Sequence, residues 1–173
     1  MTNTVKKINM IDAVKLYFKN YFNFTGRASR SEYWWAYLAF SIVVVIIAIA
    51  EGLAMGWYYA GEGVASNLFS LATFIGWLSL NARRLQDRGH TGWWQLALLI
   101  PLLPLAYFII LFTVTENESN LFALGLVIFL WLGLFITFIV FLCLPPKEDE
   151  NKWGRNPLLP DTGLNDRMSD QSL

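Results

Sequence analysis

The sequence has few charged residues for its length: only 15% of its 173 residues are Asp, Glu, Lys or Arg. Soluble domains carry roughly one quarter charged residues, so this deficit argues against an ordinary soluble domain. The chain is instead 55% hydrophobic and 16% aromatic. This composition indicates a protein with a large lipid-facing surface.

Cysteine and histidine are almost absent, which limits the chemistry that the chain supports. A single cysteine, Cys143, rules out an internal disulfide, and we expect it to behave as a small buried hydrophobic residue. With one cysteine and one histidine there are too few ligands for a zinc or iron–sulfur site, so we expect no metal and no cofactor. We also expect no nucleic-acid partner. No signal-peptide pattern is visible, so the hydrophobic segments are expected in the mature protein.

Four apolar segments follow one another along the chain, each close to the roughly 20 residues that span a bilayer. They cover residues 36–58, 64–80, 94–114 and 121–144. Before them, apolar residues recur at helical spacing opposite a polar face that carries lysines, which predicts an amphipathic helix. The apolar residues are Met10, Ile11, Val14, Phe18, Tyr21 and Phe22. Such a helix lies at a membrane surface, or packs on the protein, or does both.

The predicted fold is therefore an all-α membrane protein with four transmembrane helices and an N-terminal amphipathic interfacial helix. We expect one membrane domain over residues 1–157 and a disordered tail over residues 158–173. Ser29 and Glu32 have the spacing of a capping box, in which Ser29 accepts from the Glu32 N–H and the Glu32 carboxylate reaches back to the Ser29 N–H. This box would begin the first membrane helix.

Small residues recur four apart in the first two predicted spans. They are Ala48, Gly52 and Gly56 in the first span and Ala72 and Gly76 in the second. Such ridges let two helix backbones approach closely, so we expect these spans to pack together. In the third span, Pro101 and Pro104 lack backbone donors and are expected to kink or break the helix.

All 13 basic residues fall on one side of the predicted spans. They are Lys6, Lys7, Lys15, Lys19, Arg27 and Arg30 before the first span, Arg83, Arg84 and Arg88 between the second and third, and Lys147, Lys152, Arg155 and Arg167 after the fourth. The two opposite loops, at residues 61–63 and 115–120, contain only acidic charge. The positive-inside rule then predicts a multi-pass protein with both termini in the cytoplasm.

The segment Asn81–Trp94 holds three arginines, Asp87 and the single histidine, and it allows three interpretations. It is a cytoplasmic turn whose arginines touch lipid phosphates, with Arg83 and Asp87 as a local pair. It is part of an internal salt-bridge network that includes Glu32. Or its arginines form an anion site for a phosphate or carboxylate group.

Two further ionisable residues invite a functional interpretation. Glu51 lies inside the first predicted span, where a carboxylate is costly, and the polar second span would extend a pathway for protons or cations. Its position toward the outer end of the span favours a structural role instead. His90 titrates near neutral pH, but no second histidine, serine or cysteine is placed to complete a catalytic set with it.

Three motifs resemble a family of small bacterial inner-membrane proteins known as domain of unknown function 805. Residues 24–34 read FTGRASRSEYW, residues 83–94 read RRLQDRGHTGWW and residues 151–157 read NKWGRNP. The resemblance covers roughly residues 14–157. It implies a bacterial inner-membrane location and supports the topology, but the family has no established activity.

All three motifs fall on the predicted cytoplasmic side, so we expect them to converge into one cluster. Its candidate residues are Arg27, Arg30, Glu32, Arg83, Arg84, Asp87, Arg88, Asn151 and Gly154. We predict a structural or regulatory module that binds anionic lipid headgroups or a partner protein through this cluster, with a homo-oligomer as one form of partnership. One alternative is a small oligomeric transporter or channel that uses Glu51 and the second span. Another is a membrane-embedded enzyme acting on phospholipid headgroups through the arginines and His90, although the sequence favours a non-enzymatic role.

Overall fold

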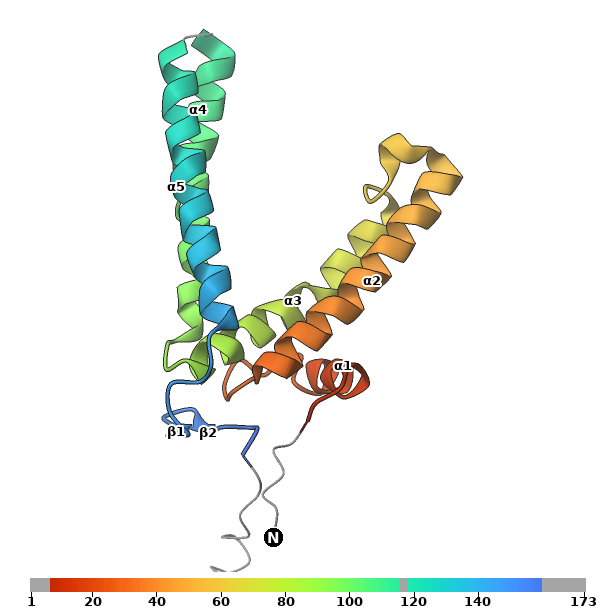
Figure 1. Cartoon of the computed structure of the whole chain (residues 1–173). Helices are drawn as coiled ribbons and strands as arrows, with labels where there is room; N and C mark the ends of the chain where they lie inside the picture. Colours follow the sequence, from red (N-terminus) through yellow and green to blue (C-terminus); the bar gives the residue numbers. More distant parts are fainter. Residues whose placement is uncertain (1–6, 116–117, 160–173) are drawn as a thin grey trace, which may run out of the picture.

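The computed structural model describes residues 7–115 and 118–159, and these form two helical hairpins that meet at one end and diverge at the other (Figure 1). The first hairpin contains α2 (Arg30–Met55), the short 3₁₀ turn η1 (Trp57–Tyr59) and α3 (Val64–Asp87). The second contains η2 (Gly92–Leu99), α4 (Leu102–Thr115) and α5 (Glu118–Cys143). The N-terminal helix α1 (Met10–Lys19) lies against both helices of the first hairpin where the hairpins meet.

The described residues contain four helical segments that are long and apolar enough to cross a membrane, as predicted. They are Arg30–Met55, Val64–Asp87, Gly92–Thr115 and Leu121–Cys143. One boundary differs in a way that matters for function. The second predicted span stops at Leu80, whereas α3 continues to Asp87, so half of the expected loop Asn81–Trp94 is helical. Helix can continue through these polar residues because their side chains are bonded inside the protein.

The start of α2 follows from its capping residue. The Ser29 side chain accepts a hydrogen bond from the Glu32 N–H at 3.1 Å, as the capping box predicts. The Glu32 carboxylate also has a hydrogen bond with the Ser29 backbone, as the other half of the box predicts, and it accepts a further hydrogen bond from Arg83 at 2.8 Å. A buried guanidinium is a charge-assisted donor and a stronger partner than a neutral backbone N–H.

The two prolines of the third span break it, as predicted. Residues Gly92–Leu99 form a 3₁₀ helix, and the α-helical part begins only after Pro101. The Pro101 carbonyl accepts the first helical hydrogen bond, from Leu105 at 3.0 Å. Pro104 lies in the first turn of α4, where backbone N–H groups have no acceptor within the helix, so its missing N–H costs no helical hydrogen bond.

The glycine ridges allow close packing, but not of one ridge against the other. A Cβ at Gly76 would collide with the ring of Tyr17 from α1, and a Cβ at Gly52 would lie 2.7 Å from a ring atom of Trp57. α2 and α3 do pack together, as expected, with Phe40 and Trp77 in contact at 5.6 Å between ring centroids. Gly52 and Gly76 therefore each make room for an aromatic side chain from a third element, whereas a Cβ at Gly56 would meet no atom within 4 Å.

Tyr17 anchors α1 to the first hairpin. Its ring is buried among Phe40 and Trp77, and its hydroxyl donates to the Thr73 carbonyl at 2.6 Å. Ala13, one turn earlier, is also buried. Burial raises the pKa of the Tyr17 phenol above its ordinary value, and the neighbouring Tyr21 raises it further. α1 is therefore held by one face, formed by Ala13 and Tyr17.

After α5, the chain forms a small hairpin from β1 (Glu150–Asn151) and β2 (Gly154–Arg155), which the sequence did not predict. Asn151 pairs with Gly154, whose φ of 118° favours glycine. Leu158 packs against the core, so the first two residues of the predicted tail, 158 and 159, belong to the described structure. The rest of that predicted tail, residues 160–173, lies outside the described residues.

Candidate functional site

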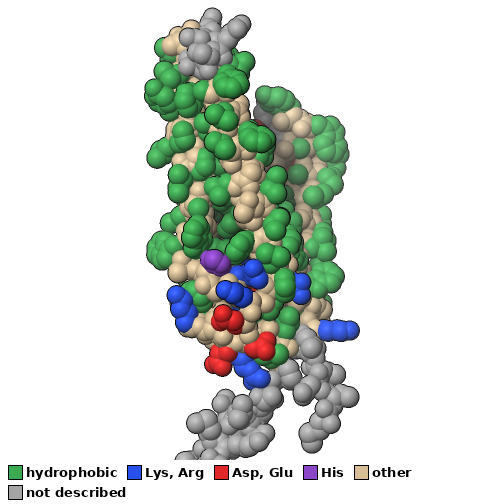
Figure 2. Space-filling view, turned by 60° about the vertical axis from the view of Figure 1, so that its left-hand side comes forward, with side chains coloured by type: hydrophobic (Ala, Val, Ile, Leu, Met, Phe, Trp, Pro, Cys, Tyr) green, Lys and Arg blue, Asp and Glu red, His purple; other side chains and the backbone are tan. Residues whose placement is uncertain are grey.

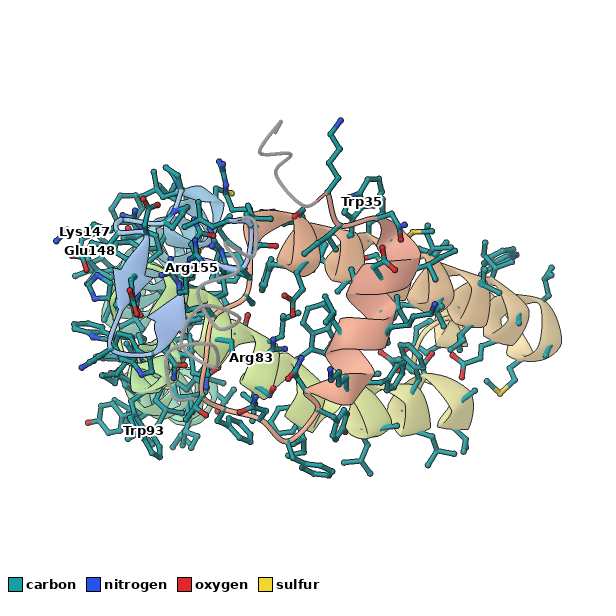
Figure 3. The ribbon with its side chains drawn as sticks, turned by 90° about the horizontal axis from the view of Figure 1, so that it is seen from below. Trp35, Arg83, Trp93, Lys147, Glu148 and Arg155 are labelled. Atoms are coloured by element: carbon teal, nitrogen blue, oxygen red, sulfur yellow. The ribbon has the colours of Figure 1, made fainter. Side chains whose placement is uncertain are left out.

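Charged side chains gather at the end where the hairpins meet, beneath walls of hydrophobic side chains (Figure 2). We call this the basic end, defined by Arg27, Arg83, Arg84 and Arg88. Viewed from below, Arg83 lies near the centre of this face, and Lys147, Glu148 and Arg155 lie around the β-hairpin (Figure 3). Most of the residues in the predicted candidate cluster lie at this end.

Asp87, at the last turn of α3, holds two arginines. Its two carboxylate oxygens accept from Arg27 Nε at 2.8 Å and from Arg84 Nη1 at 2.5 Å. All three side chains are at most 1% exposed to solvent. Arg27 precedes α2, so the carboxylate ties that loop to the end of α3. We call Arg27, Arg84 and Asp87 the clasp.

The other donors of Arg27 and Arg84 reach backbone carbonyls, most of which lie at the end of α5 or in the segment that follows it. The accepting carbonyls are those of Glu148, Asp149 and Gly154 for Arg27, and those of Ala28, Leu142 and Leu144 for Arg84. The last carbonyls of a helix have no helical partner and carry partial negative charge. Arg84 therefore caps the C-terminus of α5 while it pairs with Asp87. The two arginines exceed the single carboxylate by one charge, and these carbonyl oxygens offset the excess.

A second buried pair lies beside the clasp. Arg83 Nη1 donates to Glu32 Oε1 at 2.8 Å, and both side chains are 4% exposed. This pair joins the first turn of α2 to α3, and the Ala28 N–H adds a bond to the Arg83 carbonyl at 3.2 Å. The Nε and Nη2 atoms of Arg83 are buried without a protein partner in the described part of the chain.

The other candidate residues surround these pairs, with one exception. Arg88 donates to the Pro145 carbonyl and lies 5.2 Å from the ring centroid of Phe141. Asn151 donates to the Gln86 carbonyl at 2.9 Å. Arg30 is exposed at the start of α2, and within the described residues no hydrogen bond or ion pair joins it to the cluster. The structure therefore brings the three motifs together and leaves Arg30 outside.

Sequence reasoning missed the acceptors on which the clasp depends. Most are backbone carbonyls between Leu142 and Gly154, and backbone groups carry no residue-specific signal. It also missed Gln86, whose side-chain amide donates to the Phe24 carbonyl at 2.8 Å. Gln86 could have been predicted from its position directly before Asp87, because a polar side chain next to a buried acid also needs a hydrogen-bond partner.

Glu51 lies at the other end of the first hairpin, where it caps α3. Its carboxylate accepts from the Ser66 N–H at 3.0 Å, from the Ser66 hydroxyl at 2.5 Å and from the Gly61 N–H at 3.2 Å. Ser66 is in the first turn of α3, where backbone donors are free and negative charge is favourable. The N-cap residue Gly63 has no side chain for this task, so Glu51 performs it from α2.

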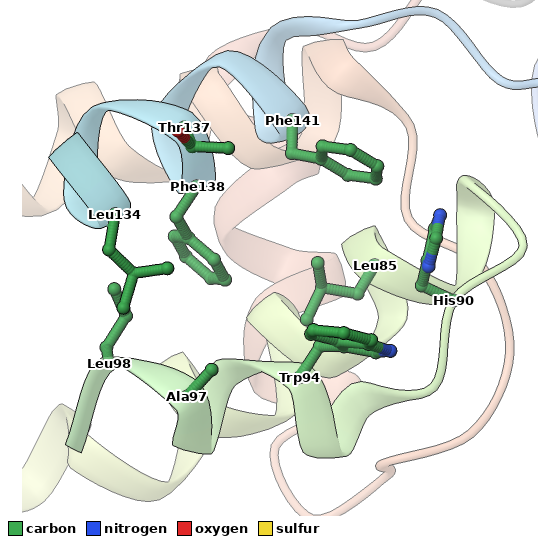
Figure 4. Close-up of a pocket in the computed structure, with 9 residues that line it drawn as sticks. All are labelled: Leu85, His90, Trp94, Ala97, Leu98, Leu134, Thr137, Phe138 and Phe141. Carbon is green, nitrogen blue, oxygen red and sulfur yellow. The ribbon is translucent and has the colours of Figure 1, made fainter. Parts of the chain in front are cut away.

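His90 lies in an apolar pocket of about 200 Å³ between η2 and α5 (Figure 4). Its ring makes edge contacts with Trp94 and Phe141, at 6.2 and 4.8 Å between centroids. The described lining residues include no acid, serine or cysteine. Cys143, expected to be buried, is exposed at the end of α5, although the preceding residue Leu142 is buried in the core. These surroundings give His90 a packing role.

Residues 21–155 match the family described as "Protein of unknown function (DUF805)". The chain belongs to this family. It is 37% identical over 84 residues to "Inner membrane protein YhaH" of Escherichia coli (strain K12), covering 48% of this chain and 69% of that protein. It is 36% identical over 105 residues to "Inner membrane protein YhaI" of the same strain, covering 59% and 82%. No solved structure matches the chain. Family membership and the four spans identify an integral inner-membrane protein.

Proposed function

We propose that this family member is a non-catalytic membrane module whose basic end faces the cytoplasm and binds anionic lipid headgroups. The orientation is supported by the sequence positions of the 13 basic residues, all of which fall in segments on the same side of the predicted spans. Anionic headgroups attract lysine and arginine at a membrane surface, which matches the exposed cations of this end.

Within this proposal the clasp has a structural role. The donors of Arg27 and Arg84 reach Asp87 and backbone carbonyls, so these side chains are occupied by the protein itself. The clasp joins the loop before α2, the end of α3 and the end of α5. We infer that it holds the two hairpins at a fixed position, so that lipid contact falls to exposed residues around it.

The observation that carries the proposal is the exposed face of α1, which points away from the first hairpin. While Ala13 and Tyr17 are buried against the hairpin, Ile11 and Phe18 are 64% and 58% exposed. Lys15 and Lys19 are exposed beside them at helical spacing. An exposed apolar strip flanked by lysines is typical of a helix lying in the membrane interface.

Native mass spectrometry of the detergent-solubilised protein with added phosphatidylglycerol tests this surface. The double substitution Lys15→Gln/Lys19→Gln should weaken lipid retention by roughly 30-fold, because each interfacial lysine contributes about 1 kcal/mol. The matched control Lys7→Gln/Lys147→Gln removes the same charge from exposed positions outside α1 and should have a smaller effect. Equal effects of the two variants would refute the role of α1. The same spectra report subunit number, and so test the predicted homo-oligomer.

A further inference from the structure

A large pocket lies beside the clasp, between α3, η2 and the turn of the β-hairpin. Its volume is about 810 Å³, within the roughly 300–1,000 Å³ typical of ligand sites. Neither the ion pairs nor the packing of the hairpins accounts for it. Trp93, one of its lining residues, lies at the edge of the basic end in Figure 3.

The polarity of the pocket changes along α3. Leu78, Ala82 and Gln86 line it at four-residue intervals, so this wall follows roughly 12 Å of one helix face. Leu78 and Ala82 lie toward the middle of the span, whereas Gln86 lies at the basic end. Lys152 lines the same polar end from the β-hairpin. A pocket that is apolar toward the membrane and polar at its surface matches the shape of a phospholipid.

Two unpartnered acceptors specify the headgroup. The Oε1 atoms of Gln86 and Gln95 are buried without a hydrogen-bond partner in the described residues, and both residues line the pocket. The amide nitrogen of Gln86 donates to the Phe24 carbonyl, which fixes its oxygen as the free atom. Gln86 as a whole is 5% exposed. Buried acceptors without donors are costly, so the ligand that suits this pocket brings N–H or O–H groups.

The aromatic lining favours a cationic donor. Phe24, Trp93 and Trp153 line the pocket, and the faces of such rings attract ammonium groups. No acidic side chain occurs among its described lining residues, and Lys152 is its one cation. The Lys152 ammonium lies 4.2 Å from the Trp153 ring centroid. The pocket thus offers acceptors and rings for an ammonium group and a lysine for a phosphate.

We propose that this pocket binds phosphatidylethanolamine from the leaflet at the basic end. The ethanolamine ammonium donates to Gln86 and Gln95 Oε1, the phosphate pairs with Lys152, and an acyl chain follows Leu78 and Ala82. This site is separate from the α1 surface and selects a zwitterionic lipid, so it goes beyond the proposed function.

Competition between lipids with the same acyl chains tests the proposal, again by native mass spectrometry of the whole protein. Phosphatidylcholine has the same charges but no N–H donor, so phosphatidylethanolamine should bind at least roughly tenfold more tightly. Equal binding of the two lipids would overturn the proposal. Tighter binding of phosphatidylglycerol would also overturn it, because glycerol hydroxyls would then be the donors.

Substitutions at Gln95 and Lys152 separate the parts of the headgroup. Gln95→Leu should abolish the preference for ethanolamine over choline and leave choline-lipid binding unchanged, whereas Gln95→Glu should increase the preference. Lys152→Gln should weaken the binding of both lipids equally, and the matched control Lys147→Gln should weaken the binding of neither. If Gln95→Leu and Gln95→Glu both leave the preference unchanged, the assignment is wrong. Lys15→Gln/Lys19→Gln should also leave it unchanged, which distinguishes this site from the α1 surface.

Discussion

The clasp makes a quantitative prediction for the substitution Asp87→Asn. Asparagine keeps the shape of Asp87 and one acceptor oxygen but removes the charge that two buried arginines share. Arg84 is fully buried, so solvent cannot replace the lost charge. Removing one partner of a buried ion pair costs roughly 3–5 kcal/mol, and for a chain of this length that corresponds to a decrease in Tm of roughly 6–20 °C.

The assay is thermal unfolding of the purified protein in detergent, followed by circular dichroism. Glu62→Gln is the matched control, because Glu62 is an exposed acid at the opposite end of the first hairpin and should change the Tm little. Arg84→Met completes a double-mutant cycle. In the Asp87→Asn background the Arg84 guanidinium has already lost its carboxylate partner. Removing it there should therefore cost less stability than in the wild-type protein. Additive effects, or a loss below about 1 kcal/mol for Asp87→Asn, would refute the coupling.

Three further predictions concern helix ends and close contacts. Glu51→Ala should accelerate hydrogen exchange of the Ser66 amide without affecting the basic end, as measured by exchange mass spectrometry. Gly76→Ala should destabilise the protein by roughly 1–3 kcal/mol in unfolding assays, because the new methyl group collides with Tyr17. Burial raises the pKa of Tyr17, so its ionisation favours the unfolded state. Stability should therefore fall as pH rises above about 10, and Tyr17→Phe should reduce this loss in unfolding measured against pH.

Several features were predictable because they depend on neighbours in the chain. A span is recognised from about 20 consecutive residues, and the Ser29 cap and the Pro101 break each act within one helical turn. The grouping of basic residues at one end can also be predicted once the spans are located in the sequence. These local patterns were enough to predict the four helices and the motifs that would share one end.

Other features depended on residues far apart in the chain. Gly76 belongs to a small-residue ridge, yet the side chain that it accommodates is Tyr17 of α1. The end of α3 was misplaced at Leu80 because hydropathy treats Arg83 and Arg84 as solvent-exposed. In the fold their charges have buried partners, and the helix continues.

The sequence by itself determined that the chain crosses a membrane four times and that its basic residues share one end, because hydrophobicity and charge are properties of composition and order. Only the tertiary structure decided that Asp87 pairs with Arg27 and Arg84, and that Gln86 and Gln95, whose Oε1 atoms are buried without a partner in the described residues, line the same pocket. Burial is the physical reason. A polar group removed from water needs a hydrogen-bond partner from the residues that the fold places beside it, and many of these partners are backbone groups.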